Sequence, residues 1–236
     1  MFENLINEWC IPHDHCRQVT ANSVTRKLLL DKTNSIRVVL DLGCGEGNSV
    51  DFFRSVKADI QWVGLDVDIS PEVEKRIRAD AEFKTFDGIH IPYEDNYFDL
   101  IYCNQVMEHV RFPEELMSNI CRVLKPKGYL VGATSQLEPY HSLSVWNYTP
   151  HGFRLLVEEA GLQLQEIRPG IDALTLIIRA ALQRPKFFSR WWEKESPLNK
   201  VINLVGFFAR KEKQEINFAK VVLCGQFCFI VQKVEG

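Results

Sequence analysis

Short apolar runs alternate with helical apolar stripes along this chain. The first run, Val38 to Leu42, has the length of a buried strand and leads into the glycine-rich turn Gly43-Cys44-Gly45-Glu46-Gly47. After the turn, Val50, Phe53 and Val56 recur at the spacing of an amphipathic helix. A strand, a glycine turn and a helix in this order are typical of an open α/β sheet that binds a nucleoside or a phosphate at the turn.

The same alternation continues to the end of the chain. Apolar runs predict strands, apolar stripes predict helices, and proline with acidic residues marks where helices begin. We expect strands at 62–66, 82–86, 98–104, 129–133, 162–168 and 220–233, and helices that begin at Ser70, Phe112, Thr149 and Ser196. The predicted fold class is α/β: a doubly wound, seven-stranded, mostly parallel sheet with an antiparallel last strand and helices on both faces.

Length and composition narrow the class of protein. A chain of 236 residues with 46% hydrophobic residues can bury one large core, so we expect a single domain over 1–236. The formal net charge of −3 argues against wholesale nucleic-acid binding. No apolar run approaches the roughly 20 residues of a membrane span. The first residues include Glu3 and Glu8 and have no apolar stretch after a basic start, so we expect no secretion signal. Seven cysteines, an odd number, suit reduced thiols, so we expect a cytoplasmic location.

The spacing of the turn glycines indicates which ligand it binds. A dinucleotide fingerprint needs a third glycine at position 48, which is Asn48 here, so a nicotinamide oxidoreductase is disfavoured. Asp66 ends the next strand, about 20 residues past the turn, where a carboxylate can accept hydrogen bonds from both hydroxyls of a ribose. The pattern therefore predicts a nucleoside site formed by the turn and Asp66.

Several motifs in order resemble one family. The segments DLGCGEG, GLD, FDGIHIPYEDNYFDLIYCNQVMEHV and RVLKPKGYLV, over roughly residues 36–168, resemble the small-molecule branch of the class I S-adenosylmethionine-dependent methyltransferases, whose fold is Rossmann-like. The usual Pro-Gly-Gly turn of that family is Pro126-Lys127-Gly128 in this chain. The resemblance implies S-adenosylmethionine as methyl donor, S-adenosylhomocysteine as product and the adenine beside Asp87. It does not specify the methyl acceptor.

The expected cofactor-binding residues gather at the carboxyl ends of neighbouring predicted strands. They are Asp41, Gly43, Cys44, Gly45, Gly47, Asp66, Val67, Asp87, Gly88, Asn104, Gln105 and His109. His109 is also the candidate general base, because neutral imidazole accepts protons near pH 7. A cofactor contact or a structural histidine is the alternative for the same residue. Asp87-Gly88 has the alternative of a simple turn.

Two further clusters contain residue types that could contact the methyl acceptor or bind a metal ion. The segment after the fifth strand lies where the family has substrate loops, so Tyr140, His141, Trp146 and Tyr148 are candidate acceptor contacts, with ordinary loop packing as the alternative. Near the N-terminus, Cys10, His13, His15 and Cys16 are four metal-ligand types in seven residues. They have no second ligand pair elsewhere, so we expect no metal.

Two segments lie outside the family pattern. Residues 1–35 are expected to be helical, and residues 171–216 form a basic, aromatic helical insertion between the last two strands. Within 179–213, nine Lys or Arg and three Glu give a net charge of +6, which leaves −9 for the rest of the chain. One interpretation is an amphipathic lid whose apolar face packs on the domain. The other is a surface that contacts an anionic substrate or the inner membrane surface from the cytoplasmic side.

The sequence thus leaves two functional hypotheses for a protein that binds S-adenosylmethionine. The first is an enzyme that methylates a small molecule, such as a hydroxyl of a glycan, a lipid-linked molecule or a secondary metabolite. The second is a regulatory or scaffold protein that binds the cofactor without turnover. The oligomeric state is left open.

Overall fold

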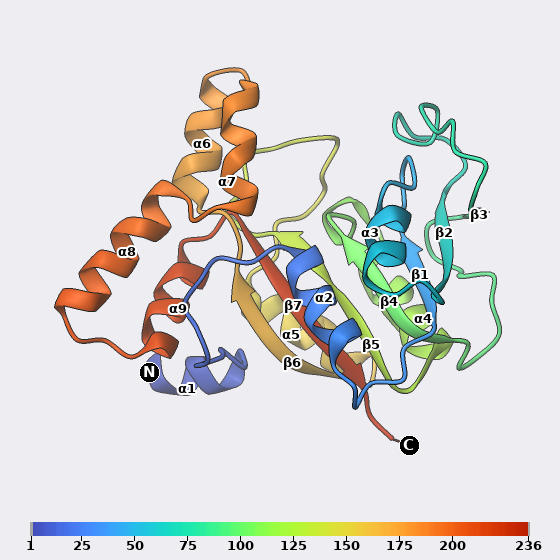
Figure 1. Cartoon of the computed structure of the whole chain (residues 1–236), viewed down its shortest axis with the longest axis horizontal. Coiled ribbons are helices and arrows are strands. Elements are labelled where there is room, and N and C mark those ends of the chain that lie inside the picture. The colour runs from blue at the N-terminus through green and yellow to red at the C-terminus, as the bar shows by residue number, and fades with distance from the viewer. Residues whose placement is uncertain (1, 236) are drawn as a thin grey trace.

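A seven-stranded sheet forms the centre of the computed structural model, which describes residues 2–235 (Figure 1). Its strands are β1 (Val38–Leu42), β2 (Gln61–Val67), β3 (Glu82–Phe86), β4 (Phe98–Asn104), β5 (Leu124–Ser135), β6 (Leu162–Pro169) and β7 (Gln226–Lys233). They lie in the order β3-β2-β1-β4-β5-β7-β6. The first five strands in this order, β3, β2, β1, β4 and β5, are parallel to one another. Strand β7 is antiparallel to both of its neighbours, β5 and β6. The predicted fold class is confirmed.

Helices cover both faces of the sheet. They are α1 (Phe2–Glu8), α2 (Ala21–Leu30), α3 (Ser49–Val56), α4 (Pro113–Val123), α5 (Pro150–Glu159), α6 (Ala173–Ala181), α7 (Arg190–Glu193), α8 (Pro197–Phe208) and α9 (Lys213–Val222), with 3-10 turns at Met107–His109 and Lys186–Ser189. Side chains of a strand alternate between the faces. Leu40 and Leu42 therefore pack toward α4 and α5, while Val39 packs toward α2 and α3. Each such fully buried side chain contributes about 1.5–3 kcal/mol.

One predicted helix start is wrong. Ser70 accepts a hydrogen bond from the N–H of Val73 at 3.1 Å, but no helix follows between β2 and β3. The segment has no apolar stripe to bury, since Ile77 is 98% exposed. Arg76 and Arg78 instead donate to the backbone carbonyls of the glycine-rich turn. Ser70 therefore begins a single turn, and the arginines that follow it pack against the glycine-rich turn. The other predicted starts lie at or next to α4, α5 and α8.

The predicted last strand begins too early. Residues 213–222 form α9, and β7 begins only at Gln226. Ile216, Asn217, Lys220 and Val221 are buried along one stripe of α9. A short apolar run does not distinguish a buried helix from a strand, which explains the error. Cys224 therefore precedes β7 and does not share a strand face with Cys228.

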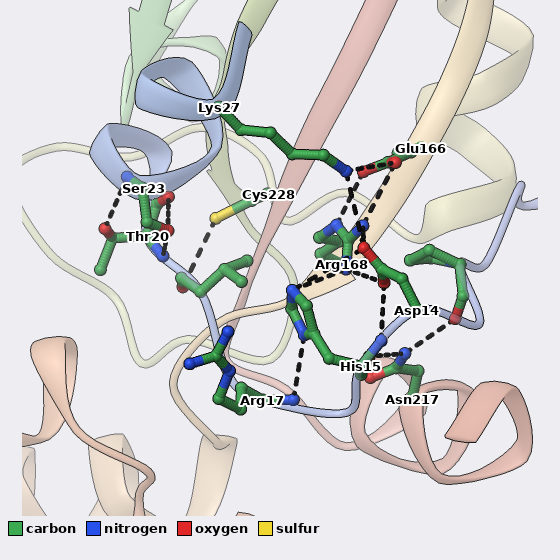
Figure 2. A network of polar contacts seen from close by, with 12 residues as sticks. Asp14, His15, Arg17, Thr20, Ser23, Lys27, Glu166, Arg168, Asn217 and Cys228 are labelled. Carbon is green, nitrogen blue, oxygen red and sulfur yellow. Dashed lines mark hydrogen bonds and ion pairs between the residues drawn. The ribbon is translucent and has the colours of Figure 1, made fainter. Parts of the chain in front are cut away.

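The N-terminal segment contains two helices, α1 and α2, joined by an extended arm, residues 9–20. Figure 2 shows how this arm is fixed to the domain. The buried guanidinium of Arg168 on β6 donates to both carboxylate oxygens of Asp14 at 3.0 Å and to Glu166 at 2.7 Å. Asn217 of α9 donates to the carbonyl of His15 at 2.7 Å. The arm is thereby held between β6 and α9.

The four metal-ligand types of this arm do not converge. Within residues 2–235, no group of three ligand atoms includes Cys10, His13, His15 or Cys16. Cys10 donates instead to the carbonyl of Leu164, and the backbone of Cys16 accepts from Lys220. The cluster is part of the packing between the arm and the sheet.

The insertion between β6 and β7 contains α6, α7 and α8 and continues into α9. These helices stand out from the β6 end of the sheet, away from β3 (Figure 1). The interpretation of a lid with its apolar face packed on the domain is wrong for α8, because Val205 and Phe208 are 60% and 75% exposed. None of the helices that the structure describes has the length and apolar character needed to cross a membrane.

Candidate functional site

The glycine-rich turn lies between β1 and α3 at the carboxyl edge of the sheet. Gly43, Gly45 and Gly47 have φ angles of +70°, +50° and +80°, which L side chains rarely adopt. A Cβ on Gly43 would lie 2.4 Å from a methyl carbon of Val106. The N–H groups of Gly43 and Cys44 donate to the carbonyl of Leu65, so the turn is fixed to the end of β2. At its three glycines the turn presents bare backbone.

Asp66 connects this turn to β2. Its Oδ2 accepts from the N–H of Gly45 at 2.6 Å, and its Oδ1 accepts from the N–H of Val67 at 2.8 Å. The structure therefore brings Asp66, Val67 and the glycine turn together, as the sequence predicts. Carboxylate oxygens have further lone pairs, so hydroxyl donors can still bind to Asp66.

Asp41 precedes the turn and is almost fully buried. Ser49 donates to its carboxylate, and Trp62 donates to the hydroxyl of Ser49. Burial raises the pKa of Asp41 to about 7, against the opposing effect of the Ser49 hydrogen bond. Asp41 thus supports the base of the turn.

Arg76 is a residue of this site that the sequence analysis missed. Its guanidinium donates to the carbonyl of Gly45 at 2.8 and 2.6 Å and stacks 4.3 Å from the ring centroid of Phe83. A positive charge therefore lies directly against the turn. Arg76 belongs to the segment wrongly expected to be a helix, and no local pattern indicates its partner.

Asp87 and Gly88 follow β3 at the same edge. Asp87 accepts from the N–H groups of Ile89 and His90 and contacts the His90 ring at 2.6 Å. These hydrogen bonds, that of His90 first, hold the pKa of Asp87 well below its usual range. Asp87 thus closes its own turn, as the alternative interpretation has it. The adenine role stays a prediction.

Asn104 and Gln105 end β4 and line a cavity of about 180 Å³. Gln105 has φ +58°, its Oε1 accepts from Gln226, and its Nε2 is buried without a hydrogen-bond partner. Trp192 and Glu193 of α7 form another wall of this cavity. An unpaired buried donor is costly, so Gln105 has an unused donor beside the space where a ligand would lie.

Titratable groups converge at the 3-10 turn Met107–His109 that follows β4. One ligand atom each of Glu108, His109 and His141 lies within 4.8 Å of the others, and the rings of His109 and His141 are 5.5 Å apart. Burial, followed by the charge of His141, lowers the pKa of His109. Burial raises the pKa of Glu108 to about 7, although Thr134 and Ser135 donate to its carboxylate. The set can exchange protons and also has the ligand types of a metal site.

Ser135 links this cluster to a second carboxylate. Its hydroxyl lies 3.2 Å from Glu108 and 2.8 Å from Glu138, and Gln226 donates to the same oxygen of Glu138 at 2.7 Å. Glu138 lies 3.8 Å from His141. Ser135, Glu138 and His141 are close in the sequence, but Glu108 lies 27 residues before Ser135, so no local pattern predicts the four residues as a unit.

The predicted acceptor contacts divide into two kinds. His141 faces His109, as described above. Tyr148 is half-buried against Phe153 and donates to the carbonyl of Met107, and Trp146 donates to the carbonyl of Val110. Tyr140 is 69% exposed, and its carbonyl accepts from Arg184. His141 is therefore the member of this group that the structure places in the proton-exchanging cluster.

Gln18 of the N-terminal arm holds α7 over the cavity. Its side-chain amide donates to the carbonyls of Trp191 and Trp192 at 2.6 and 3.3 Å. Its carbonyl oxygen accepts from the Ser196 N–H and the Asn199 amide. Glu195, which accepts from the backbone N–H of Gln18, is paired with the buried Lys220. The arm, α7 and α9 are thus one hydrogen-bonded unit.

This fold and this site define a nucleoside-binding α/β protein of the methyltransferase class. The sequence pattern of a methyltransferase domain family matches residues 13–167, more than half of the chain, and the chain belongs to that family. The methyl donor of the class is S-adenosylmethionine.

Individual relatives support the same assignment over part of their length. The chain is 29% identical over 149 residues to the methyltransferase GfsG of Streptomyces halstedii, covering 55% of this chain and 54% of that protein. It is 32% identical over 111 residues to the demethylmenaquinone methyltransferase of Renibacterium salmoninarum, covering 46% of each. The chain thus spans about half the length of the curated relatives it matches.

A solved structure shows the same fold. Phosphoethanolamine N-methyltransferase 2 of Haemonchus contortus, in complex with S-adenosyl-L-methionine, superposes with a TM-score of 0.56 at 17% identity. The match covers 91% of this chain and 52% of that one.

The residues of this chain fit the cofactor of the class. A Cβ at Gly43, Gly45 or Gly47 would lie 2.4 to 3.1 Å from a neighbouring side chain, so only glycine leaves bare backbone in this turn. The carboxylate of Asp66 lies beside the turn, and the unpaired amide of Gln105 lies just after β4. The glycine turn thus offers backbone for the amino-acid tail of the cofactor, the Asp66 carboxylate offers acceptors for its ribose, and the Gln105 amide offers a donor for a neighbouring polar atom.

Proposed function

We propose that this protein is a methyltransferase that moves the methyl group of S-adenosylmethionine to a hydroxyl of an acceptor with an apolar part, such as a lipid-linked or glycan-linked molecule or a secondary metabolite. The observation that carries the proposal is the convergence of His109 and His141 with Glu108 and Glu138. This cluster begins two residues after Val106, whose side chain lies against Gly43 of the glycine turn. The cofactor supplies an electrophilic methyl group on a sulfonium. The protein supplies the arrangement of the reactants, which is worth about 7–11 kcal/mol in well-oriented pairs.

Each residue has a defined task in this proposal. The glycine turn and Asp66 hold the nucleoside, and Asn104 and Gln105 bind polar groups at the end of β4. His109 accepts the proton of the acceptor hydroxyl at a ring nitrogen while the oxygen–carbon bond forms and the carbon–sulfur bond breaks. His109 is half-buried, and the lowered pKa of its imidazole keeps the ring neutral near pH 7.

Binding is tested first. Calorimetric titration of the purified chain with S-adenosylmethionine and with NAD should show binding of the former alone. Preferential binding of NAD would refute the assignment of the turn. The Asn48 position makes this comparison decisive, because a dinucleotide fingerprint requires glycine there.

Turnover is tested second. The chain is incubated with S-adenosylmethionine labelled in its methyl group and with a total cell extract, followed by separation of lipid and aqueous fractions. We expect a labelled product that requires the active chain. Binding of the cofactor without any labelled product in either fraction would favour the regulatory or scaffold alternative.

A further inference from the structure

The insertion between β6 and β7 exposes an apolar surface made by two helices. On α6, the exposed apolar residues recur at i, i+3, i+4 and i+8, and on α8 at i, i+3, i+4 and i+7, so each helix presents one continuous stripe to solvent. The residues are Leu174, Ile177 and Ile178 on α6 with Leu182 directly after it, and Val201, Leu204, Val205 and Phe208 on α8. Exposed fractions range from 43% for Ile178 to 75% for Phe208.

Helix α8 exposes its apolar side chains and buries a polar one, whereas a core helix does the opposite. Its buried residues are Asn199 and Gly206, and Gly206 packs against Ile216 of α9. The polar Asn199 is turned inward because it donates to Gln18 and to the carbonyl of Gly170. Native contacts therefore hold the apolar stripe of α8 away from the domain. Contiguous exposed apolar surface of this kind marks an interaction site.

Basic residues flank these stripes along the chain. Eight of the nine Lys or Arg between 179 and 213 are exposed, and Arg179 is intermediate. They are opposed by three Glu, and one of these, Glu195, is paired with the buried Lys220. The segment thus has a net charge of +6 in a chain whose remainder has −9. A partner of this surface has to accept apolar side chains and also carry negative charge.

A second copy that docks through the same stripes does not fit this requirement, because it would bring two +6 segments together. An anionic bilayer supplies both an apolar interior and a negatively charged headgroup layer. We propose that the exposed stripes of α6 and α8, with their basic rim, dock this protein on an anionic membrane surface.

The docked face leads to the site described above. A groove of about 610 Å³ lies between α6 and the segment after β5, lined by Leu137, Glu138, Pro139, Ala173, Ile177 and Ala180. Ile177 belongs both to this groove and to the exposed stripe of α6. Glu138 belongs both to the groove and to the network with Ser135 and His141. An acceptor anchored in the bilayer can therefore extend from the docked face toward His141. This part of the inference rests on the proposed function and specifies a membrane-anchored acceptor.

The test is co-sedimentation of the full chain with vesicles of phosphatidylcholine and with vesicles that contain phosphatidylglycerol as well. We expect binding to the anionic vesicles that weakens in high salt, as charge screening requires. Phe208→Glu and the double variant Lys186→Glu, Lys194→Glu should each bind these vesicles at least about tenfold more weakly. The first replaces an apolar contact with a carboxylate, and the second reverses two charges that face the anionic headgroups.

The matched control is Ile77→Glu. Ile77 is 98% exposed and lies in the segment between β2 and β3, remote from α6 and α8 in Figure 1, so its replacement should leave vesicle binding unchanged. Equal vesicle binding by the wild type, Phe208→Glu and the double lysine variant, or none by the wild type, would overturn the proposal. A wild-type dimer in sedimentation velocity that Phe208→Glu dissociates would also overturn it, in favour of a second copy.

Calorimetric titration with S-adenosylmethionine separates this inference from the proposed function. Vesicle binding without cofactor binding would leave the docking surface standing and refute the methyltransferase assignment. Cofactor binding without vesicle binding would refute the docking surface and leave the proposed function standing. Normal cofactor affinity of Phe208→Glu also shows that this variant is folded.

Discussion

The N–H of Gly45 donates to Oδ2 of Asp66 at 2.6 Å, so the carboxylate expected to bind a ribose also fixes the glycine turn. Asp66→Ala should remove two hydrogen bonds from ligand hydroxyls to a charged acceptor, each worth roughly 1.5–3 kcal/mol. The affinity for S-adenosylmethionine, measured by calorimetry, should fall by at least about ten- to a hundredfold. Asp68→Ala, two residues along and exposed, is the control. An unchanged dissociation constant of Asp66→Ala would refute the ribose assignment.

The close approach of Gly43 to Val106 gives a second prediction. Gly43→Ala introduces both a left-handed φ for alanine and a Cβ 2.4 Å from a Val106 methyl carbon. We expect about 1–3 kcal/mol less stability in urea unfolding, together with weakened cofactor binding. Gly161→Ala is the matched control, because Gly161 has φ +82° while its nearest neighbour to a new Cβ is 3.9 Å away. That variant should lose stability and retain cofactor affinity.

Gln18 should determine how firmly α7 covers the cavity. Gln18→Ala removes the partner of two carbonyls of α7 and of the Asn199 amide, which leaves part-buried groups unpaired. We expect faster amide hydrogen exchange across residues 186–199, measured by mass spectrometry, with cofactor affinity nearly unchanged. The exposed Gln163 offers the matched variant Gln163→Ala. Equal exchange in the two variants would contradict the role of Gln18.

The Asp14–Arg168 pair should make stability depend on pH. Burial raises the pKa of Asp14, but the hydrogen bonds and charge of Arg168 outweigh it and lower this pKa well below its usual range. A lowered folded-state pKa contributes stability above the unfolded value of about 3.9, and the contribution is lost as pH falls toward the folded value. Asp14→Asn should therefore cost about 1 kcal/mol at pH 7 in urea unfolding, and the difference should shrink below about pH 4. Asp59→Asn, at an exposed position, should show neither effect.

His109 gives the pH dependence of turnover. A general base acts while neutral, and the pKa of His109 is lowered, so the rate should be full at pH 7 and fall on the acidic side. His109→Gln should lose about 10²–10⁴ in kcat and retain cofactor affinity. His141→Gln removes a charge that lowers this pKa, so the acidic limb should move to higher pH. His13→Gln, an exposed histidine, is the control. Normal turnover of His109→Gln would make His109 a wall residue.

The sequence predicts only those residues of the candidate site that belong to a local pattern, such as a strand end or a glycine-rich turn. Gly43 to Gly47 and Asp66 follow consecutive strands of a parallel sheet, and such strands bring their carboxyl ends to one edge. Arg76 and Gln18 could not be predicted, because their partners depend on contacts across 31 and 173 residues. No periodicity records such pairs.

The sequence by itself determined the order of the strands and helices around the first turn, because apolar period, glycine and proline act over a few residues. Only the tertiary structure decided that Ser70 opens no helix, that residues 213–222 are helical and that α8 turns Asn199 inward and Phe208 outward. In each case, the free energy of contacts with distant elements outweighs the local preference. The sequence predicts the apolar stripe of α8, but the contacts of Asn199 and Gly206 with distant segments determine the direction in which the stripe faces.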